Sequence, residues 1–221
     1  MNPMWGIALA TVIAIVDWWA LKQRHRRLDY AAKPGVMAAL LAALFLASPT
    51  ANGRAWFALA IAFSLLGDVF LMLPREQFRA GLLAFLLAHL AYMAGFIRQV
   101  PSRWDILTLM ALIIAGASAI PGRRILTALS ARGESGLRLP VAIYMGVLAG
   151  MVFAAWSTWV QPAWPPRASA LVSVGAVLFL ASDTLLAWNR FVRPVPDARL
   201  KVRVLYHLGQ ILLVTGVLLT R

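Results

Sequence analysis

Residues 55–73 read AWFALAIAFSLLGDVFLML, and residues 168–188 read ASALVSVGAVLFLASDTLLAW. Both stretches are apolar and close to the ~20 residues that an α-helix needs to cross a bilayer. Each carries one acidic residue about a turn from its end, Asp68 and Asp183. An ionisable group inside a membrane helix costs several kcal/mol unless it has a partner or water, so it marks a functional site by default. The two stretches therefore predict a membrane protein whose site contains both aspartates.

The composition of the whole chain indicates the same class. Of the 221 residues, 62% are hydrophobic and only 13% are charged, and the mean hydropathy is +0.78. These values are typical of an integral membrane protein, and we expect a single membrane domain over residues 1–221. The chain has no cysteine, which excludes disulfides, thiolate nucleophiles and cysteine-bound zinc.

Eight apolar segments follow one another, separated by proline and charged residues. We expect an all-α, polytopic bundle of eight transmembrane helices over residues 4–21, 35–51, 55–73, 80–97, 104–120, 139–160, 168–188 and 203–219. The first segment lacks the cleavage site of a secretory signal, so we expect it to stay as a helix. Asp68 and Asp183 lie four helices apart in segments that run the same way. This spacing is compatible with a duplication of two parallel four-helix halves.

Positive charge is distributed unevenly over the connections between these segments. Sixteen of the 21 Lys and Arg residues lie in the first, third, fifth and seventh connections, with Arg203 at the start of the last segment counted in the seventh. By the positive-inside rule, these connections face the cytoplasm and both termini lie outside it. The net charge of +13 then reflects orientation and attraction to anionic lipid, and not a nucleic-acid partner. We expect a multi-pass protein of the cell's inner (plasma) membrane.

This orientation brings polar residues of distant helices to one depth. Late in the inward-running segments are Asp17, Asp68, Ser182 and Asp183. Early in the outward-running segments are Lys33, Tyr144, Tyr206, His207 and Gln210. His89 and Tyr92 lie deeper and share a helix face, as do Tyr206 and Gln210. Gly67 and Gly209 are expected to let helices approach closely. We expect one polar cavity, open toward the cytoplasm or the inner leaflet, with His89 and Tyr92 near its floor.

Each of these residues also has a structural interpretation. For Asp68 and Asp183 this is a salt bridge, which we disfavour because no Lys or Arg is expected inside a helix at their depth. Asp17, beside Trp18 near the interface, is equally compatible with plain solvation. His89 and the tyrosines are also compatible with packing. Lys33 and Arg190 agree with the positive-inside rule whether or not they bind a ligand.

Several spaced motifs resemble the YhhN family of eight-helix membrane proteins, which includes the lysoplasmalogenases. The motifs are GDVFL at 67–71, HLAY at 89–92, PVAIYMGVLAGM at 140–151, GAVLFLASDTLLAWNRF at 175–191 and YHLGQILL at 206–213. The resemblance covers nearly the whole chain. It implies hydrolysis of the vinyl-ether bond of a lysoplasmalogen to a fatty aldehyde and glycerophosphoethanolamine or glycerophosphocholine. The implied partners are a lysophospholipid substrate and membrane lipid, with no cofactor and no metal.

The implied reaction needs an acid that stays protonated near neutral pH. Protonation of the alkene carbon gives an oxocarbenium ion, which water captures as a hemiacetal. A carboxyl group in a poorly solvated pocket can supply this proton, while an ionised second carboxylate stabilises the cation. We expect Asp68 and Asp183 to form this pair within about 10 Å of each other. Either residue can fill either role.

The remaining candidates are expected to bind the substrate. They are Ser182, Tyr206, Gln210, His89, Tyr92, Tyr144, Lys33, Arg190 and Asp17. Lys33 and Arg190 at the cytoplasmic rim are expected to hold the phosphate as charge-assisted donors. Apolar side chains of the third, fourth and seventh helices are expected to form a slot for one hydrocarbon chain.

Two other classes of function stay open. A metal hydrolase of the membrane ceramidase kind needs three or four His or carboxylate ligands, for which His89, His207, Asp68 and Asp183 are the candidates. A proton-coupled transporter also uses intramembrane carboxylates. A transporter is expected to carry polar residues through the outer half of its helices as well, and this chain has few there.

Overall fold

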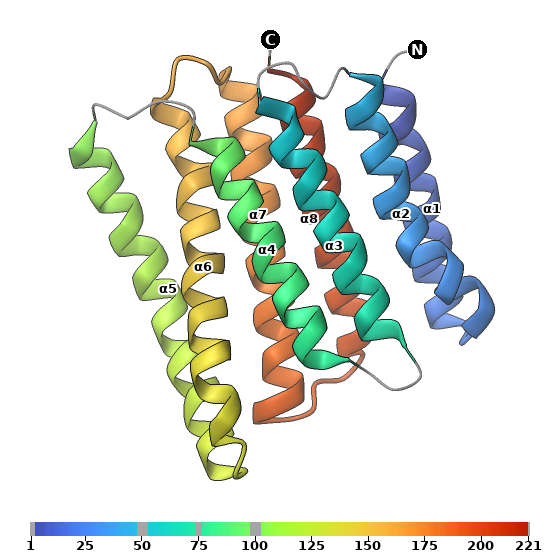
Figure 1. The fold of residues 1–221 in the computed structure, drawn as a ribbon, viewed down its shortest axis with the longest axis vertical. Coiled ribbons are helices and arrows are strands. Elements are labelled where there is room, and N and C mark those ends of the chain that lie inside the picture. Colours follow the sequence, from blue (N-terminus) through green and yellow to red (C-terminus); the bar gives the residue numbers. More distant parts are fainter. Residues whose placement is uncertain (1–2, 48–52, 74–76, 98–102, 221) are drawn as a thin grey trace.

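The structure is a computed structural model that describes residues 3–47, 53–73, 77–97 and 103–220. Within these ranges the chain forms eight helices long and apolar enough to cross a membrane, and no strand (Figure 1). They are α1 (Met4–Lys22), α2 (Arg26–Leu46), α3 (Arg54–Met72), α4 (Phe78–Phe96), α5 (Trp104–Ala131), α6 (Arg138–Ser157), α7 (Pro166–Ala187) and α8 (Ala198–Leu218). Short helical turns are η2 (Ser135–Leu137), η3 (Thr158–Val160) and the π-turn η4 (Trp188–Val192). The predicted all-α membrane bundle is confirmed.

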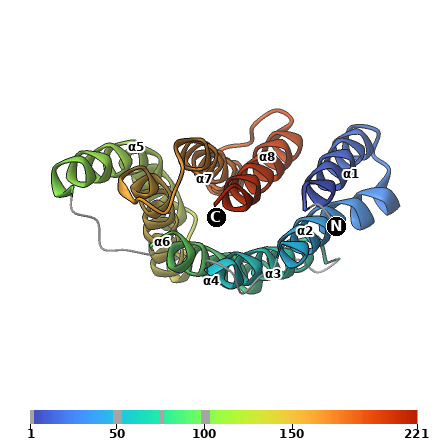
Figure 2. The same cartoon turned by 90° about the horizontal axis from the view of Figure 1, so that it is seen from above.

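The helices form a curved row with two helices inside the curve. Seen from above, α5, α6, α4, α3, α2 and α1 follow one another along the row, and α7 and α8 lie on its concave side (Figure 2). The most extensive packing joins α7 to α8, α3 to α4 and α1 to α2, and α8 also contacts α1, α2 and α3. Helix α8 is therefore central, and polar residues on it meet partners from several helices.

Three glycines allow close helix contacts beside the site. A Cβ atom added to Gly175 on α7 would lie 2.8 Å from the carbonyl oxygen of Gly209 on α8, closer than real Cβ contacts. A Cβ atom on Gly67 would lie 2.6 Å from a ring carbon of Phe85. The close approach expected at Gly67 and Gly209 is therefore observed, and it places the Phe85 ring directly against α3.

Helix α2 begins well before the predicted residue 35. Its first turns start at Arg26 and continue through Pro34, although a proline inside a helix removes a hydrogen bond and crowds the preceding turn. These turns have tertiary partners, because Asp29 pairs with Arg203 and Lys33 pairs with Asp68. Lys33 therefore lies inside helix α2 and not in the connection that precedes it.

Helices α5 and α8 also extend beyond their predicted bounds. Helix α5 passes through Pro121 and ends at Ala131, where Ile125 and Leu129 pack in a small core with residues of α6 and η4. Helix α8 begins at Ala198, a turn before residue 203, so Arg199 is helical. The other predicted segments agree with the observed helices to within a few residues. The duplication into two halves stays a prediction.

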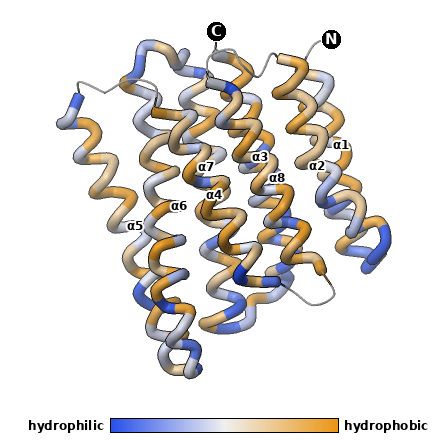
Figure 3. The backbone as a smooth tube through the Cα atoms, viewed as in Figure 1, coloured by the Kyte–Doolittle hydropathy of each residue, from blue (hydrophilic) through white to orange (hydrophobic). Residues whose placement is uncertain are grey.

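Hydrophilic residues gather at one end of the bundle. The lower end in Figure 3 contains the α1–α2, α5–α6 and α7–α8 connections and most of the hydrophilic colouring, while the middle of the helices is hydrophobic. The N- and C-terminal ends lie at the opposite end of the molecule (Figure 1). The charged end is thus the one that the positive-inside rule assigns to the cytoplasm.

Candidate active site

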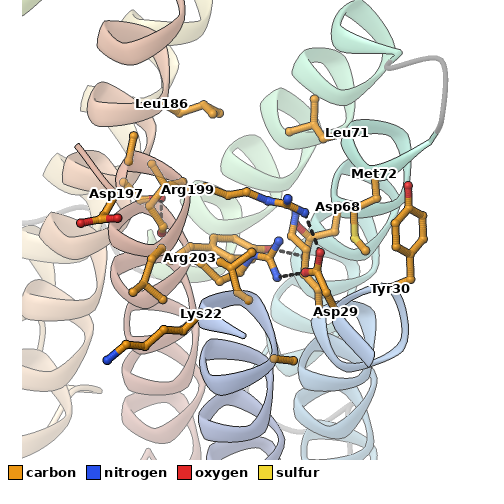
Figure 4. Close-up of a pocket in the computed structure, with 18 of the residues that line it drawn as sticks. Lys22, Asp29, Tyr30, Asp68, Leu71, Met72, Leu186, Asp197, Arg199 and Arg203 are labelled. Carbon is orange, nitrogen blue, oxygen red and sulfur yellow. Dashed lines mark hydrogen bonds and ion pairs between the residues drawn. The ribbon is translucent and has the colours of Figure 1, made fainter. Parts of the chain in front are cut away.

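A cavity of about 1180 Å³ lies at the charged end, among the last turns of α1, α3 and α7 and the first turns of α2 and α8 (Figure 4). Five of the candidate residues from the sequence line it: Lys33, Asp68, Ser182, Asp183 and Tyr206. They come from α2, α3, α7 and α8. The structure therefore brings both aspartates to one cavity, and their chemical roles stay a prediction.

Lys33, Asp68 and Tyr206 form the Asp68 cluster. The Lys33 ammonium lies 2.8 Å from one carboxylate oxygen of Asp68, and the Tyr206 hydroxyl donates a 2.8 Å hydrogen bond to the other. The Asp68 side chain is 1% exposed. The expectation that no base lies at this depth was wrong, because the early start of α2 carries Lys33 inward to face α3. A buried carboxylate with a cation and a phenol donor is satisfied in its ionised form.

His89, Tyr144 and Asp183 form the Asp183 cluster. The Tyr144 hydroxyl donates a hydrogen bond to Asp183, and His89 Nε2 lies 3.0 Å from the Tyr144 oxygen and 3.6 Å from the same Asp183 oxygen. Because the Tyr144 hydroxyl donates its proton to Asp183, the Tyr144 oxygen can accept a hydrogen bond from the His89 imidazole. In the described part of the chain, no Lys or Arg forms an ion pair with Asp183. The two aspartates therefore have different surroundings.

Aromatic rings separate the two clusters. The Phe179 ring centroid lies 4.8 Å from that of His89 and 5.3 Å from that of Tyr206. The Phe85 ring packs edge-on against Tyr206 and Phe179. Apolar rings between the clusters exclude water and lower the local dielectric, which strengthens the electrostatic interactions within each cluster.

A second cavity of about 540 Å³ adjoins the first and is almost entirely apolar. The residues that line both cavities are Leu71, Phe85, Asp183 and Leu186. Asp183 thus stands at the junction of a charged cavity and an apolar one. The slot expected from the third, fourth and seventh helices is present, and α5 and α6 also contribute to it, for example through Ile125 and Leu148.

A second charged network lies behind the Asp68 cluster. The Arg203 guanidinium binds both oxygens of Asp17, at 2.8 and 2.7 Å, and one oxygen of Asp29 at 2.8 Å. Arg199 reaches the other oxygen of Asp29 at 2.6 Å (Figure 4). Asp17 is fully buried and does not line the cavity, so the solvated alternative for this residue was wrong. Its closest contact is with Arg203, and the binding role predicted for Asp17 stays a prediction.

Sequence reasoning missed Asp29 and Arg199 because their segments were assigned to connections, and it missed Arg203 because this residue stood at the first position of the predicted eighth helix. All three line the cavity. A signal was present, since Asp29 and Lys33 are four residues apart, as are Arg199 and Arg203. Such pairs lie on the same face of a helix.

Of the other candidates, Ser182 lines the cavity, and Tyr92, Gln210 and Arg190 do not. Ser182 donates to the Val202 carbonyl at 3.0 Å. Deeper in the bundle, the Tyr92 hydroxyl donates to Gln210, and the Gln210 amide donates to Ser64 at 3.0 Å. The Arg190 guanidinium lies 4.1 Å from the ring centroid of Phe78 and does not line the cavity, so its predicted place at the phosphate rim was wrong.

The candidate metal ligands do not converge. Among the described residues, no group of three or more His, Asp or Glu side chains is placed to hold a metal ion. His89 lies beside Asp183, whereas His207 lies 3.8 Å from Asp17 in the other network. The geometry therefore does not favour the metal-hydrolase alternative.

Eight membrane helices around a charged cavity that adjoins an apolar one define a polytopic membrane protein with a site shaped for an amphipathic molecule. The model of the YhhN family matches residues 28–217. The chain therefore belongs to the YhhN family, as its motifs indicated.

Several curated relatives of the chain are named lysoplasmalogenase. The chain is 30% identical over 186 residues to the lysoplasmalogenase of Mycobacterium tuberculosis, and the match covers 81% of this chain and 67% of that protein. It is 33% identical over 154 residues to the pig (Sus scrofa) lysoplasmalogenase TMEM86B, covering 70% of this chain and 59% of that protein. The human TMEM86B is 30% identical over 177 residues, which cover 79% of this chain and 69% of that protein. No solved structure matches the chain.

Proposed function

We propose that this protein is a lysoplasmalogenase of the cell's inner (plasma) membrane. It hydrolyses the vinyl-ether bond of a lysoplasmalogen to a fatty aldehyde and glycerophosphoethanolamine or glycerophosphocholine. Membership of the YhhN family and the names of its curated relatives support the general activity. The observation that carries the proposal for the site is the position of Asp183 between the charged and the apolar cavity.

The two cavities match the two parts of such a substrate. A lysoplasmalogen has one hydrocarbon chain joined through the vinyl ether to a glycerol that carries the phosphate head group. The chain fits the apolar cavity, and the glycerophosphate fits the charged cavity, whose walls include Arg199 and Lys22. The scissile bond joins these two parts, so it falls at the junction beside Asp183.

The surroundings of the two aspartates support an assignment of their roles. Asp183 accepts a hydrogen bond from the neutral Tyr144 hydroxyl on one oxygen, which leaves the other oxygen for a proton. We assign Asp183 as the acid that protonates the alkene carbon remote from the ether oxygen. In this assignment Asp68, which lies 2.8 Å from the Lys33 ammonium, is the negative group that stabilises the oxocarbenium ion.

Hydrolysis then proceeds without a cofactor. Water adds to the cationic carbon and gives its proton to the Asp183 carboxylate, which restores the acid. The hemiacetal collapses when its hydroxyl proton passes to the ether oxygen, so that the aldehyde forms and the glycerol hydroxyl leaves. Each turnover thus consumes one water, and the protein returns to its starting protonation state.

The test is aldehyde release from a lysoplasmalogen by the purified protein in detergent, compared between the parent and Asp183→Asn. Loss of a general acid reduces the rate by about 100- to 10,000-fold, and we expect kcat to fall at least that far. We expect Asp68→Asn to be nearly inactive as well. The matched control is Asp105→Asn, since the Asp105 side chain is 66% exposed and pairs with Arg103 away from the cavity.

Two results contradict the proposal at different levels. If the folded parent releases no aldehyde, the substrate class is wrong. If the parent is active and Asp183→Asn keeps more than about a tenth of its kcat, Asp183 is not the acid, because a tenfold loss corresponds to only about 1.4 kcal/mol.

A further inference from the structure

A third cavity of about 460 Å³ lies further along α7, toward the end of the molecule that carries the chain termini. Residues of α5, α6, η3 and α7 line it, among them Trp156, Trp159 and Val174. Among the described residues that line it, only Ser173 and the indole nitrogens of Trp156 and Trp159 are polar, and the Trp159 nitrogen donates to the Ser173 hydroxyl at 3.0 Å. This cavity is therefore suited to hydrocarbon.

Val177 lines both the second and the third cavity. Two apolar cavities thus follow one another along α7, beginning at Asp183 and ending at the hydrogen bond between Trp159 and Ser173. The second cavity begins at Asp183, beside the proposed position of the scissile bond. A hydrocarbon chain attached at that bond would therefore extend directly into the two apolar cavities.

We propose that the two cavities form one track for the hydrocarbon chain of the substrate and of the aldehyde product. In this proposal Val177 determines how kcat/KM depends on the length of that chain. This inference rests on the proposed function and adds to it a residue that sets chain specificity. The ligand class is a single unbranched hydrocarbon chain of a lysolipid.

The dimensions of the track set the chain lengths that reach each part of it. Ser173 and Asp183 are ten residues apart on α7, or about 15 Å at 1.5 Å per residue. An extended hydrocarbon chain advances about 1.3 Å per carbon, given C–C bonds of ~1.5 Å at tetrahedral angles. The whole track thus holds about 12 carbons. Val177 lies six residues from Asp183, at about the seventh carbon.

One side of the track faces the membrane. Val174 is 52% exposed and Val177 is 39% exposed on a helix that spans the bilayer. Hydrocarbon from the bilayer therefore contacts the track directly. A lysolipid in the leaflet can place its chain there by lateral movement, without exposing the chain to water.

The experiment compares Val177→Trp with the parent on two lysoplasmalogens whose alkenyl chains have six and sixteen carbons. We expect kcat/KM for the long chain to fall tenfold or more, because the indole fills the passage between the two cavities. The short chain ends before Val177, so its kcat/KM should change less than twofold. The matched control is Val12→Trp on α1, where Val12 is 58% exposed and lines none of the three cavities.

The proposal of a track is overturned if Val177→Trp lowers kcat/KM equally for both lysoplasmalogens, or lowers it for neither. A parent that hydrolyses neither lipid overturns the proposed function instead, so the two failures are distinguishable. A second experiment measures binding by photocrosslinking. It uses the parent protein and an alkyl-ether lysophospholipid with a photoreactive group near its tenth carbon, so it depends neither on turnover nor on the folding of a variant. We expect crosslinks at 156–159 and 173–178. Crosslinks spread evenly over all membrane-facing helices indicate ordinary annular lipid and also overturn the proposal.

Discussion

Lys33 pairs with Asp68 at 2.8 Å, and its predicted role as a phosphate ligand stays a prediction. Lys33→Met removes the ammonium and leaves the Asp68 carboxylate buried beside Tyr206 with no cation in direct contact. Breaking a buried ion pair from one side costs about 3–5 kcal/mol. We therefore expect a clear drop in Tm, measured by thermal unfolding in detergent, together with loss of activity.

The double variant Lys33→Met/Asp68→Asn is the control for this prediction. At position 68 the double variant has no buried carboxylate without a cation, because both charges are removed. Most of the lost stability should therefore return, while activity stays low. A Lys33→Met protein with the parent's Tm and only a raised KM would mean that Lys33 binds the head group after all.

Arg199 replaces Arg190 as the expected phosphate ligand. Its side chain is 66% exposed at the cavity wall, and Asp29 keeps Arg203 as a partner when Arg199 is removed. We expect Arg199→Ala to raise KM for a lysoplasmalogen several-fold with little change in kcat, as for lost uniform binding. Arg190→Ala is the matched control and should leave KM unchanged, since Arg190 stacks on Phe78 outside the cavity. A fall in kcat at constant KM would exclude Arg199 as a head-group ligand.

At the level of the elements, the contact between α7 and α8 positions Asp183 relative to Tyr206. Gly175→Ala places a Cβ atom 2.8 Å from the Gly209 carbonyl oxygen, which is backbone and cannot turn aside. Overpacking of this kind costs about 1–3 kcal/mol, so we expect a lower Tm and reduced activity.

Gly146→Ala on α6 is the matched control, because a Cβ atom there meets nothing within 4 Å. Alanine is favoured over glycine inside a helix by roughly 0.5–1 kcal/mol, so this variant should be as stable as the parent or slightly more stable. If both variants show the same Tm, close packing of α7 on α8 does not limit stability.

At the scale of the whole molecule, the charged cavity is expected to face the cytoplasm. The chain has no cysteine, so single cysteines can report the orientation without background. Glu134→Cys lies between α5 and α6 at the charged end, and Arg167→Cys lies at the start of α7 at the other end. A membrane-impermeant maleimide applied to intact cells should label Arg167→Cys, and should label Glu134→Cys only after permeabilisation. The reverse pattern would place the cavity outside the cytoplasm.

Much of the architecture could be predicted because the relevant signals are local along the chain. Hydrophobic length identified the membrane helices, and loop charge indicated their direction. Depth along each helix then indicated that Asp68, Asp183 and Tyr206 lie at one level, and all three line the same cavity. Prolines were misleading at the helix ends. Pro34 and Pro121 lie inside α2 and α5, where tertiary contacts outweigh the local cost of proline.

The sequence by itself determined the class of protein, the eight helices and the depth of the acidic residues, since each depends on residues close together in the chain. Only the tertiary structure decided the partners: Lys33 with Asp68, Tyr144 with Asp183, and Arg203 between Asp17 and Asp29. A partner depends on how each helix is rotated and which helix packs beside it. Those properties arise from packing over the whole bundle, which neither spacing nor composition specifies.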